Sequence, residues 1–158
     1  MKKLICGLLV LGAFGVGSLW AADPFAGTWK LNVAKSKFAK GHEVKDETVV
    51  IAEQGDNRVV TLKGTTGDGK PISVKYTVPS AGGTQTYTEG APAAGAGATV
   101  LTKRVDANTV DATSTLNGKV VGTQHSVLSA DGKTITLTVT YTGDDGKSSK
   151  GVTILNRQ

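Results

Sequence analysis

The feature that most constrains this chain is a strict alternation of apolar and hydroxylated residues near its C-terminus. Residues 134–142 read TITLTVTYT, with an apolar side chain at every second position. A period of two predicts a β-strand that buries one face and exposes the other. Residues 71–79 and 109–116 show a similar alternation, and no comparably long helical pattern accompanies them. The sequence therefore predicts an all-β protein.

Short turn signals separate the alternating segments. Asn-Gly-Lys or Asp-Gly-Lys occurs at 68–70, 117–119, 131–133 and 145–147, and the last three are spaced 14 residues apart. Asn and Asp tolerate positive φ and Gly adopts it freely, which favours the primed turns of tight hairpins. A spacing of one strand plus one turn indicates a continuous meander in which successive strands pair.

The whole pattern predicts ten strands and one long loop. The loop is 89–98, EGAPAAGAGA, which has no side chain able to anchor a core. An antiparallel meander of this length hides its edges by closing on itself, so we expect an up-and-down β-barrel. The ten expected strands are 26–32, 47–53, 58–65, 71–79, 84–89, 98–105, 109–116, 119–129, 134–142 and 149–156.

One segment between the first two strands has a different pattern. Asn32 is a good N-cap, Gly41 is a good C-cap, and Ala34 and Phe38 lie four residues apart, which predicts a helix of about two turns over 33–40. Two interpretations remain open: a solvated helix that covers one end of the barrel, or a basic lid that attracts anionic ligands or a membrane surface. The basic residues concerned are Lys35, Lys37, Lys40 and Lys45.

Residues 1–22 have the pattern of a secretory signal peptide. Lys2 and Lys3 precede an apolar run, and Ala21-Ala22 provides a small-residue cleavage site after either alanine. A retained membrane anchor is the alternative, but it needs about 20 apolar residues. We therefore expect a signal peptide at 1–22, a single domain at 23–158 without a membrane span, and a periplasmic or secreted location in a bacterium.

Removal of the signal narrows the chemistry of the mature chain. The net charge falls from +5 to +3, which is too small to indicate a nucleic-acid-binding surface. The only cysteine, Cys6, is also removed. Disulfides, thiolate catalysis and cysteine-bound zinc are thereby excluded. His42 and His125 have no partner nearby in sequence, and an enzyme would require His125 to gather two acidic or polar partners. We expect no enzymatic activity, no metal and no cofactor.

The start of the mature domain carries a family resemblance. Gly27-Thr28-Trp29 resembles the Gly-x-Trp signature on the first strand of lipocalins and fatty-acid-binding proteins, the calycin superfamily. The chain is most similar to small exported lipocalin-like proteins of environmental bacteria. This resemblance implies that Trp29 packs at the closed end of the barrel. The Arg-x-Tyr pair that holds a carboxylate in fatty-acid-binding proteins is missing, because this chain ends in Asn156-Arg157-Gln158.

We therefore expect a monomeric, non-enzymatic barrel that binds a small apolar or amphipathic ligand in its interior. The alternative is a filled barrel, a structural or interaction domain of the cell envelope without a small-molecule ligand. Cavity volume distinguishes the two. The side chain of Arg104 could point into the barrel or out of it. Arg104 is an even number of residues from Val100, which gives both the same parity and puts them on one face of the strand, whereas its neighbours favour the opposite face. The candidate ligand-binding residues are Val74, Tyr76, Arg104, Leu137, Val139 and Tyr141.

Overall fold

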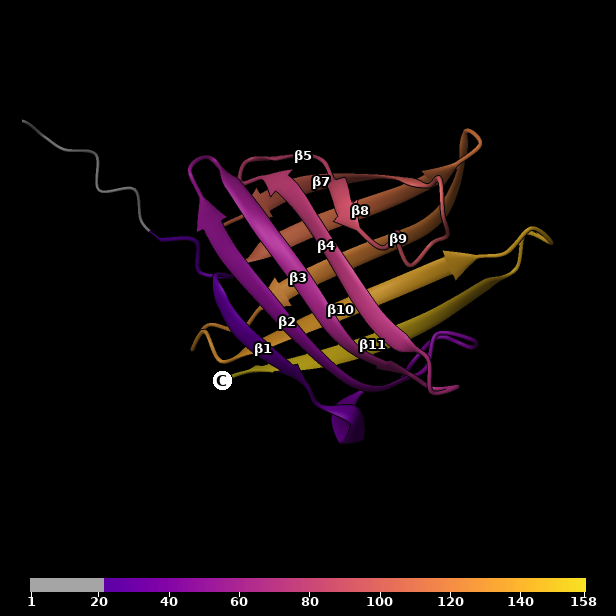
Figure 1. The fold of residues 1–158 in the computed structure, drawn as a ribbon, viewed down its shortest axis with the longest axis horizontal. Coiled ribbons are helices and arrows are strands. Elements are labelled where there is room, and N and C mark those ends of the chain that lie inside the picture. The colour runs from indigo at the N-terminus through magenta and orange to yellow at the C-terminus, as the bar shows by residue number, and fades with distance from the viewer. Residues whose placement is uncertain (1–21) are drawn as a thin grey trace, which may run out of the picture.

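The structure, a computed structural model, describes residues 22–158 and is a single antiparallel barrel (Figure 1). The expected signal peptide lies outside the described residues, except for Ala22. Among residues 22–158 no helix is long and apolar enough to cross a membrane. The strands are β1 (Gly27–Leu31), β2 (Val44–Gln54), β3 (Asn57–Thr66), β4 (Pro71–Pro79), β5 (Gly82–Thr84), β6 (Thr86–Glu89), β7 (Thr99–Asp106), β8 (Thr109–Leu116), β9 (Lys119–Leu128), β10 (Thr134–Thr142) and β11 (Ser148–Arg157).

The strands form one sheet that nearly closes on itself. Their order is β5-β7-β8-β9-β10-β11-β1-β2-β3-β4-β6, so the ends of the sheet are the adjacent short strands β5 and β6. β5 pairs with β7, β6 pairs with β4, and the Gln85 amide between them donates to the Val100 carbonyl. The segment 82–89 therefore changes partner at Gln85. This change splits one of the ten expected strands and makes the count eleven.

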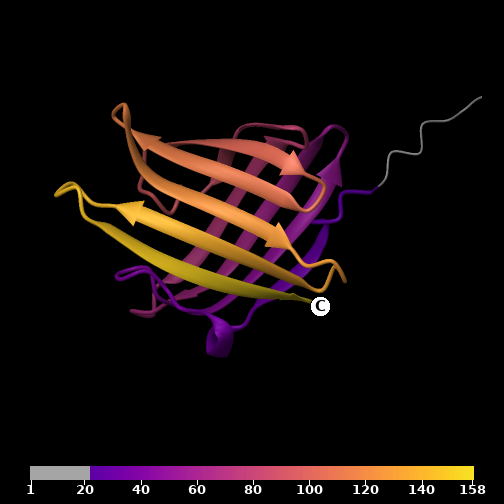
Figure 2. The ribbon, with the colours of Figure 1, turned by 180° about the vertical axis from the view of Figure 1, so that it is seen from behind.

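The alternation seen in the sequence sets the faces of the barrel. β10 pairs with β9 and β11 along most of its length, with Leu137 opposite both Ser126 and Thr153. Its apolar residues face inward and its threonines outward, as the period of two predicts. β1 to β4 form one wall and β7 to β11 the other, and the strands of the two walls cross (Figures 1 and 2).

The hairpin turns are of two kinds. Asn117 and Gly118 both have positive φ, 50° and 76°, as a primed turn requires. At the other three signals only the glycine has positive φ, for example 68° at Gly132, whose amide donates to the Ser129 carbonyl. Primed turns are thus confirmed at one position of four. At 131–133 the Asp131 carboxylate instead accepts the Lys133 amide and ends the turn.

The predicted two-turn helix is wrong, because only a 3-10 turn forms at Val33–Lys35. Asn32 does cap it, since its side chain accepts the Lys35 amide. Beyond this turn the chain becomes extended: the Lys37 amide donates to the Val152 carbonyl at 2.7 Å, and the Lys37 carbonyl accepts the Val152 amide at 2.6 Å. Backbone pairing with β11 has displaced a weak local helical preference.

β1 begins and the chain ends at the same end of the barrel (Figure 1), and Trp29 of β1 lies opposite Arg157 of β11 there, so we call this the closed end. The Trp29 side chain is 0% exposed, and its indole N–H donates to the Phe25 carbonyl at 2.9 Å. The guanidinium of Arg157 lies over the indole, 4.2 Å from the ring centroid, and donates to the carbonyls of Pro24, Ala26 and Gly132. The C-terminal arginine therefore ties the first and last strands together at the closed end.

Candidate functional site

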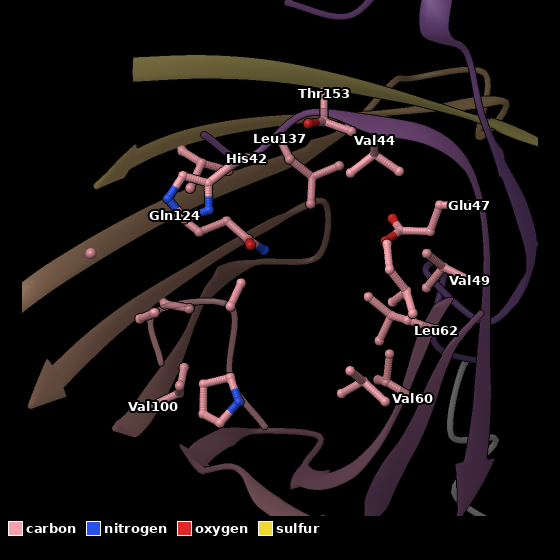
Figure 3. Close-up of a pocket in the computed structure, with 18 of the residues that line it drawn as sticks. His42, Val44, Glu47, Val49, Val60, Leu62, Val100, Gln124, Leu137 and Thr153 are labelled. Atoms are coloured by element: carbon pink, nitrogen blue, oxygen red, sulfur yellow. The ribbon is translucent and has the colours of Figure 1, made fainter. Parts of the chain in front are cut away.

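The inward faces of the strands enclose a cavity of about 780 Å³ (Figure 3). This volume lies within the range of roughly 300–1,000 Å³ usual for small-molecule sites. Aromatic residues make up only 5% of the chain, so valines and other small side chains line the barrel without filling it. The aliphatic wall comes from both sides of the barrel and includes Val49, Val60, Leu62, Val74, Val100 and Leu137.

Most of the candidate ligand-binding residues lie on this wall. Val74 and Tyr76 face the cavity from β4, and Leu137, Val139 and Tyr141 face it from β10. Their placement follows from the alternation, since each shares the inward parity of its strand. Their contact with a ligand remains a prediction.

Arg104 is the exception, because it does not line the cavity. It lies near the end of β7 at the closed end of the barrel, where its guanidinium donates to the Ser80 and Ala107 carbonyls. It also forms an ion pair of 2.7 Å with Asp23 and lies over the Phe25 ring. The structure thus places Arg104 outside the cavity wall, in contrast to its expected position, and gives it a role in closing the barrel.

A different arginine, Arg58 of β3, is part of the cavity wall and was not among the predicted residues. It is 5% exposed, and its Nε lies 3.4 Å from the carboxylate of Asp23. Within residues 22–158, neither Nε nor Nη2 of Arg58 has a hydrogen-bond partner. Burial lowers the pKa of this guanidinium and Asp23 raises it, but an arginine stays charged in a protein. The floor of the cavity therefore contains a cation that the protein pairs incompletely.

Glu47 of β2 is the second unpredicted polar residue of the wall. Its carboxyl group points into the cavity among aliphatic side chains such as Val49 and Leu62 (Figure 3). Burial raises the pKa of Glu47 to about 7, and the neighbouring Asp46 adds to this rise. The sequence signal for both residues was parity: Glu47 has the inward parity of Val49, and Arg58 has that of Val60.

A smaller polar network lies beside Tyr76. The Tyr87 hydroxyl donates to the Gln85 side chain at 2.5 Å, and Gln85 donates to the Thr102 hydroxyl at 3.1 Å. The rings of Tyr76 and Tyr87 lie 5.2 Å apart. Burial raises the pKa of Tyr87 to about 12 and raises that of Tyr76 as well, so both phenols stay protonated at neutral pH. These groups can donate or accept hydrogen bonds on the cavity wall.

The mouth of the cavity lies at the end opposite Trp29. There the His42 ring stacks on Tyr141, with centroids 3.6 Å apart and an angle of 4° between the planes. Burial lowers the pKa of His42, which favours the neutral ring. Residues 91–94 of the expected long loop also line the cavity. The segment between the 3-10 turn and β2 contributes Gly41, His42 and Glu43 to this mouth. The four lysines of the expected basic segment are exposed: Lys35 in the turn, Lys37 and Lys40 after it, and Lys45 on β2.

The described residues offer little else for catalysis. His125 lies on the outer face of β9, with its Nδ1 2.6 Å from the Asp111 carboxylate, and Asp111 is the only acidic partner within ion-pair distance in residues 22–158. No group of three or more His, Cys, Asp or Glu side chains in this part of the chain is arranged to hold a metal ion.

No protein-family model matches the sequence, and a search of curated proteins found no relative. Solved structures do match. Zebrafish ileal bile acid-binding protein complexed with cholic acid is 12% identical over 85% of this chain and 99% of its own, with a TM-score of 0.48. Lobster apocrustacyanin A1 is 14% identical over 87% of this chain and 63% of its own, with a TM-score of 0.42. The siderocalin Ex-FABP is 14% identical over 85% and 74%, with a TM-score of 0.38.

At these identities the likeness concerns the fold alone. The strand order and the tryptophan of the first strand at the closed end are features that this chain shows independently. The structure itself shows an all-β, antiparallel, nearly closed up-and-down barrel, which is the fold that the Gly27-Thr28-Trp29 resemblance implies.

Proposed function

We propose that this protein is an exported, non-enzymatic carrier that binds a small apolar or amphipathic molecule inside its barrel. The observation that carries the proposal is the cavity of about 780 Å³ with a mainly aliphatic wall. A filled barrel, the alternative function as a structural or interaction domain, would have an interior packed with side chains. The open interior favours carriage.

Filling the cavity tests binding directly. Leu137→Trp adds an indole to the inward face of β10, whereas Thr138→Trp places the same group on the outer face of the same strand. We expect Leu137→Trp to weaken binding of the probe anilinonaphthalenesulfonate by at least about tenfold, or 1.4 kcal/mol. Thr138→Trp should bind it like the unmodified protein. Equal binding by all three proteins would contradict an interior site.

The natural ligand can be sought by native mass spectrometry of the protein recovered from its own cells. A copurified lipid or pigment of constant mass supports carriage, and repeated recovery of ligand-free protein counts against it. Recovery from the periplasm or medium in a form that lacks residues 1–22 supports the export part of the proposal, which the signal-like pattern of these residues motivates.

A further inference from the structure

The polar groups of the cavity are unevenly placed along the barrel. Arg58 lies on β3 near the closed end, and Glu47 lies across from Gly64, toward the mouth. Arg58 and Gly64 are six residues apart on one strand, a length of about 20 Å at roughly 3.3 Å per residue. Between these two points the wall is aliphatic, with Val49, Val60 and Leu62 on neighbouring strands (Figure 3).

Arg58 is positioned to receive an anionic group. Its partner Asp23 is already engaged, because one carboxylate oxygen lies 2.7 Å from Arg104 and the other accepts the Phe25 amide. Two guanidinium groups thus share one carboxylate. Glu53 is nearby, but it accepts the backbone amide of Asp23 and pairs with neither arginine. Arg58 therefore keeps buried N–H groups for which residues 22–158 supply no acceptor.

Glu47 has the opposite chemistry. Its carboxyl group faces the cavity, and no side chain among residues 22–158 forms an ion pair with it. Two other charged groups that line the mouth are occupied: the Glu43 carboxylate accepts the Gly41 amide, and Lys70 pairs with Asp68 at 2.8 Å. A ligand that carries a hydrogen-bond donor would satisfy Glu47.

Resting on the proposed carrier function, we propose that the ligand is an elongated amphiphile with two polar ends. A carboxylate or similar anion binds Arg58 at the closed end, an aliphatic body fills the middle, and a hydroxyl or amine donates to Glu47 near the mouth. This arrangement satisfies both buried groups at once, whereas a simple alkyl acid would leave Glu47 without a partner.

The test compares three probes of equal chain length: hexadecanoic acid, hexadecanol and omega-hydroxyhexadecanoic acid. Their dissociation constants are measured by displacement of anilinonaphthalenesulfonate. The hydroxy acid should bind most tightly to the unmodified protein. Arg58→Met should weaken both acids by about tenfold and leave hexadecanol nearly unchanged, as expected for loss of a charge-assisted hydrogen bond. Glu47→Gln should weaken the hydroxy acid about threefold or more relative to hexadecanoic acid, since the amide is a poorer acceptor than a carboxylate.

Controls separate these effects from misfolding. Lys63→Met removes an exposed positive charge from the same strand and should change no dissociation constant. If Arg58→Met does not fold, Arg58→Lys keeps the charge and removes the planar fork, and it should weaken the acids alone. Equal binding of the three probes, or equal weakening of all three by either variant, would overturn the two-ended ligand while leaving the carrier intact. Failure of every probe, including anilinonaphthalenesulfonate, would instead overturn the carrier function.

Discussion

Replacing Trp29 with alanine tests the architecture at its closed end. The indole is 0% exposed and sits in the cluster of buried residues at the base of the barrel. Truncation of a fully buried aromatic residue costs about 3–5 kcal/mol. Two further losses, the hydrogen bond to the Phe25 carbonyl and the contact with Arg157, place this variant in the upper part of that range.

We therefore expect Trp29→Ala to lower the free energy of unfolding by about 4–5 kcal/mol, the upper part of that range. A domain of this size has roughly 5–15 kcal/mol in total, so the variant should be marginal. Trp29→Phe keeps most of the apolar volume and loses the indole N–H, and it should lose only about 1–2 kcal/mol. The comparison separates packing from the hydrogen bond.

Guanidinium unfolding followed by far-ultraviolet circular dichroism is the suitable assay. Trp20 and Trp29 are the only tryptophans in the chain, and Trp20 belongs to the expected signal peptide, so the variants have no tryptophan in the mature domain with which to follow unfolding by fluorescence. The slope of the transition should stay constant if only native stability changes. A loss below about 1 kcal/mol for Trp29→Ala would show that the residue does not close the barrel, and the strand register would then be wrong.

Two other predictions concern Glu47 and the mature N-terminus. The pKa of Glu47 is raised from 4.5 to about 7, so the native state loses stability as the pH rises through this interval. Glu47→Gln should therefore be more stable than the unmodified protein by about 2 kcal/mol at pH 8, with little difference at pH 5. Urea unfolding at each pH measures this difference. The same difference at both pH values would contradict a buried carboxyl. If cleavage follows Ala22, intact mass should show Asp23 as the first residue, and its new ammonium would lie against Glu53, whose carboxylate accepts the Asp23 nitrogen at 2.6 Å. A mature mass that begins at neither Ala22 nor Asp23 would refute the expected cleavage site.

The strands were predictable because their signal is local. Alternation and turn tripeptides lie within each hairpin, and hairpins pair neighbours in sequence, so the expected ranges agree with the observed strands to within a few residues. The change of partner at Gln85 was not predictable, since it depends on where β4 and β7 arrive in space. The helix failed for the same reason: Asn32 caps as expected, but Val152 takes the backbone groups of Lys37.

The candidate site was predictable only on its apolar side. Val74, Tyr76, Leu137, Val139 and Tyr141 were placed by parity, and all five line the cavity. Parity alone did not predict the position of Arg104. An inward side chain at the end of a strand can bind groups at the closed end of the barrel instead of lining the cavity, as Arg104 does. Its long side chain reaches a carboxylate whose position depends on a segment 81 residues away.

Arg58 and Glu47 are ionisable residues on the inner face of the barrel, where apolar side chains would be more stable. A charged residue at an inward position opposes folding, because it must be desolvated without a full set of partners. Methionine at position 58 or leucine at position 47 would make the ligand-free barrel more stable, since both would extend the aliphatic wall formed by Val49 and Val60. Arg58 pairs with Asp23 at the closed end but keeps two buried nitrogens without a hydrogen-bond partner, and Glu47 has no ion-pair partner among residues 22–158, so both groups carry a desolvation cost. Their presence is explained if the cavity is occupied, because a ligand with matching ends turns each unpaired group into a binding contact.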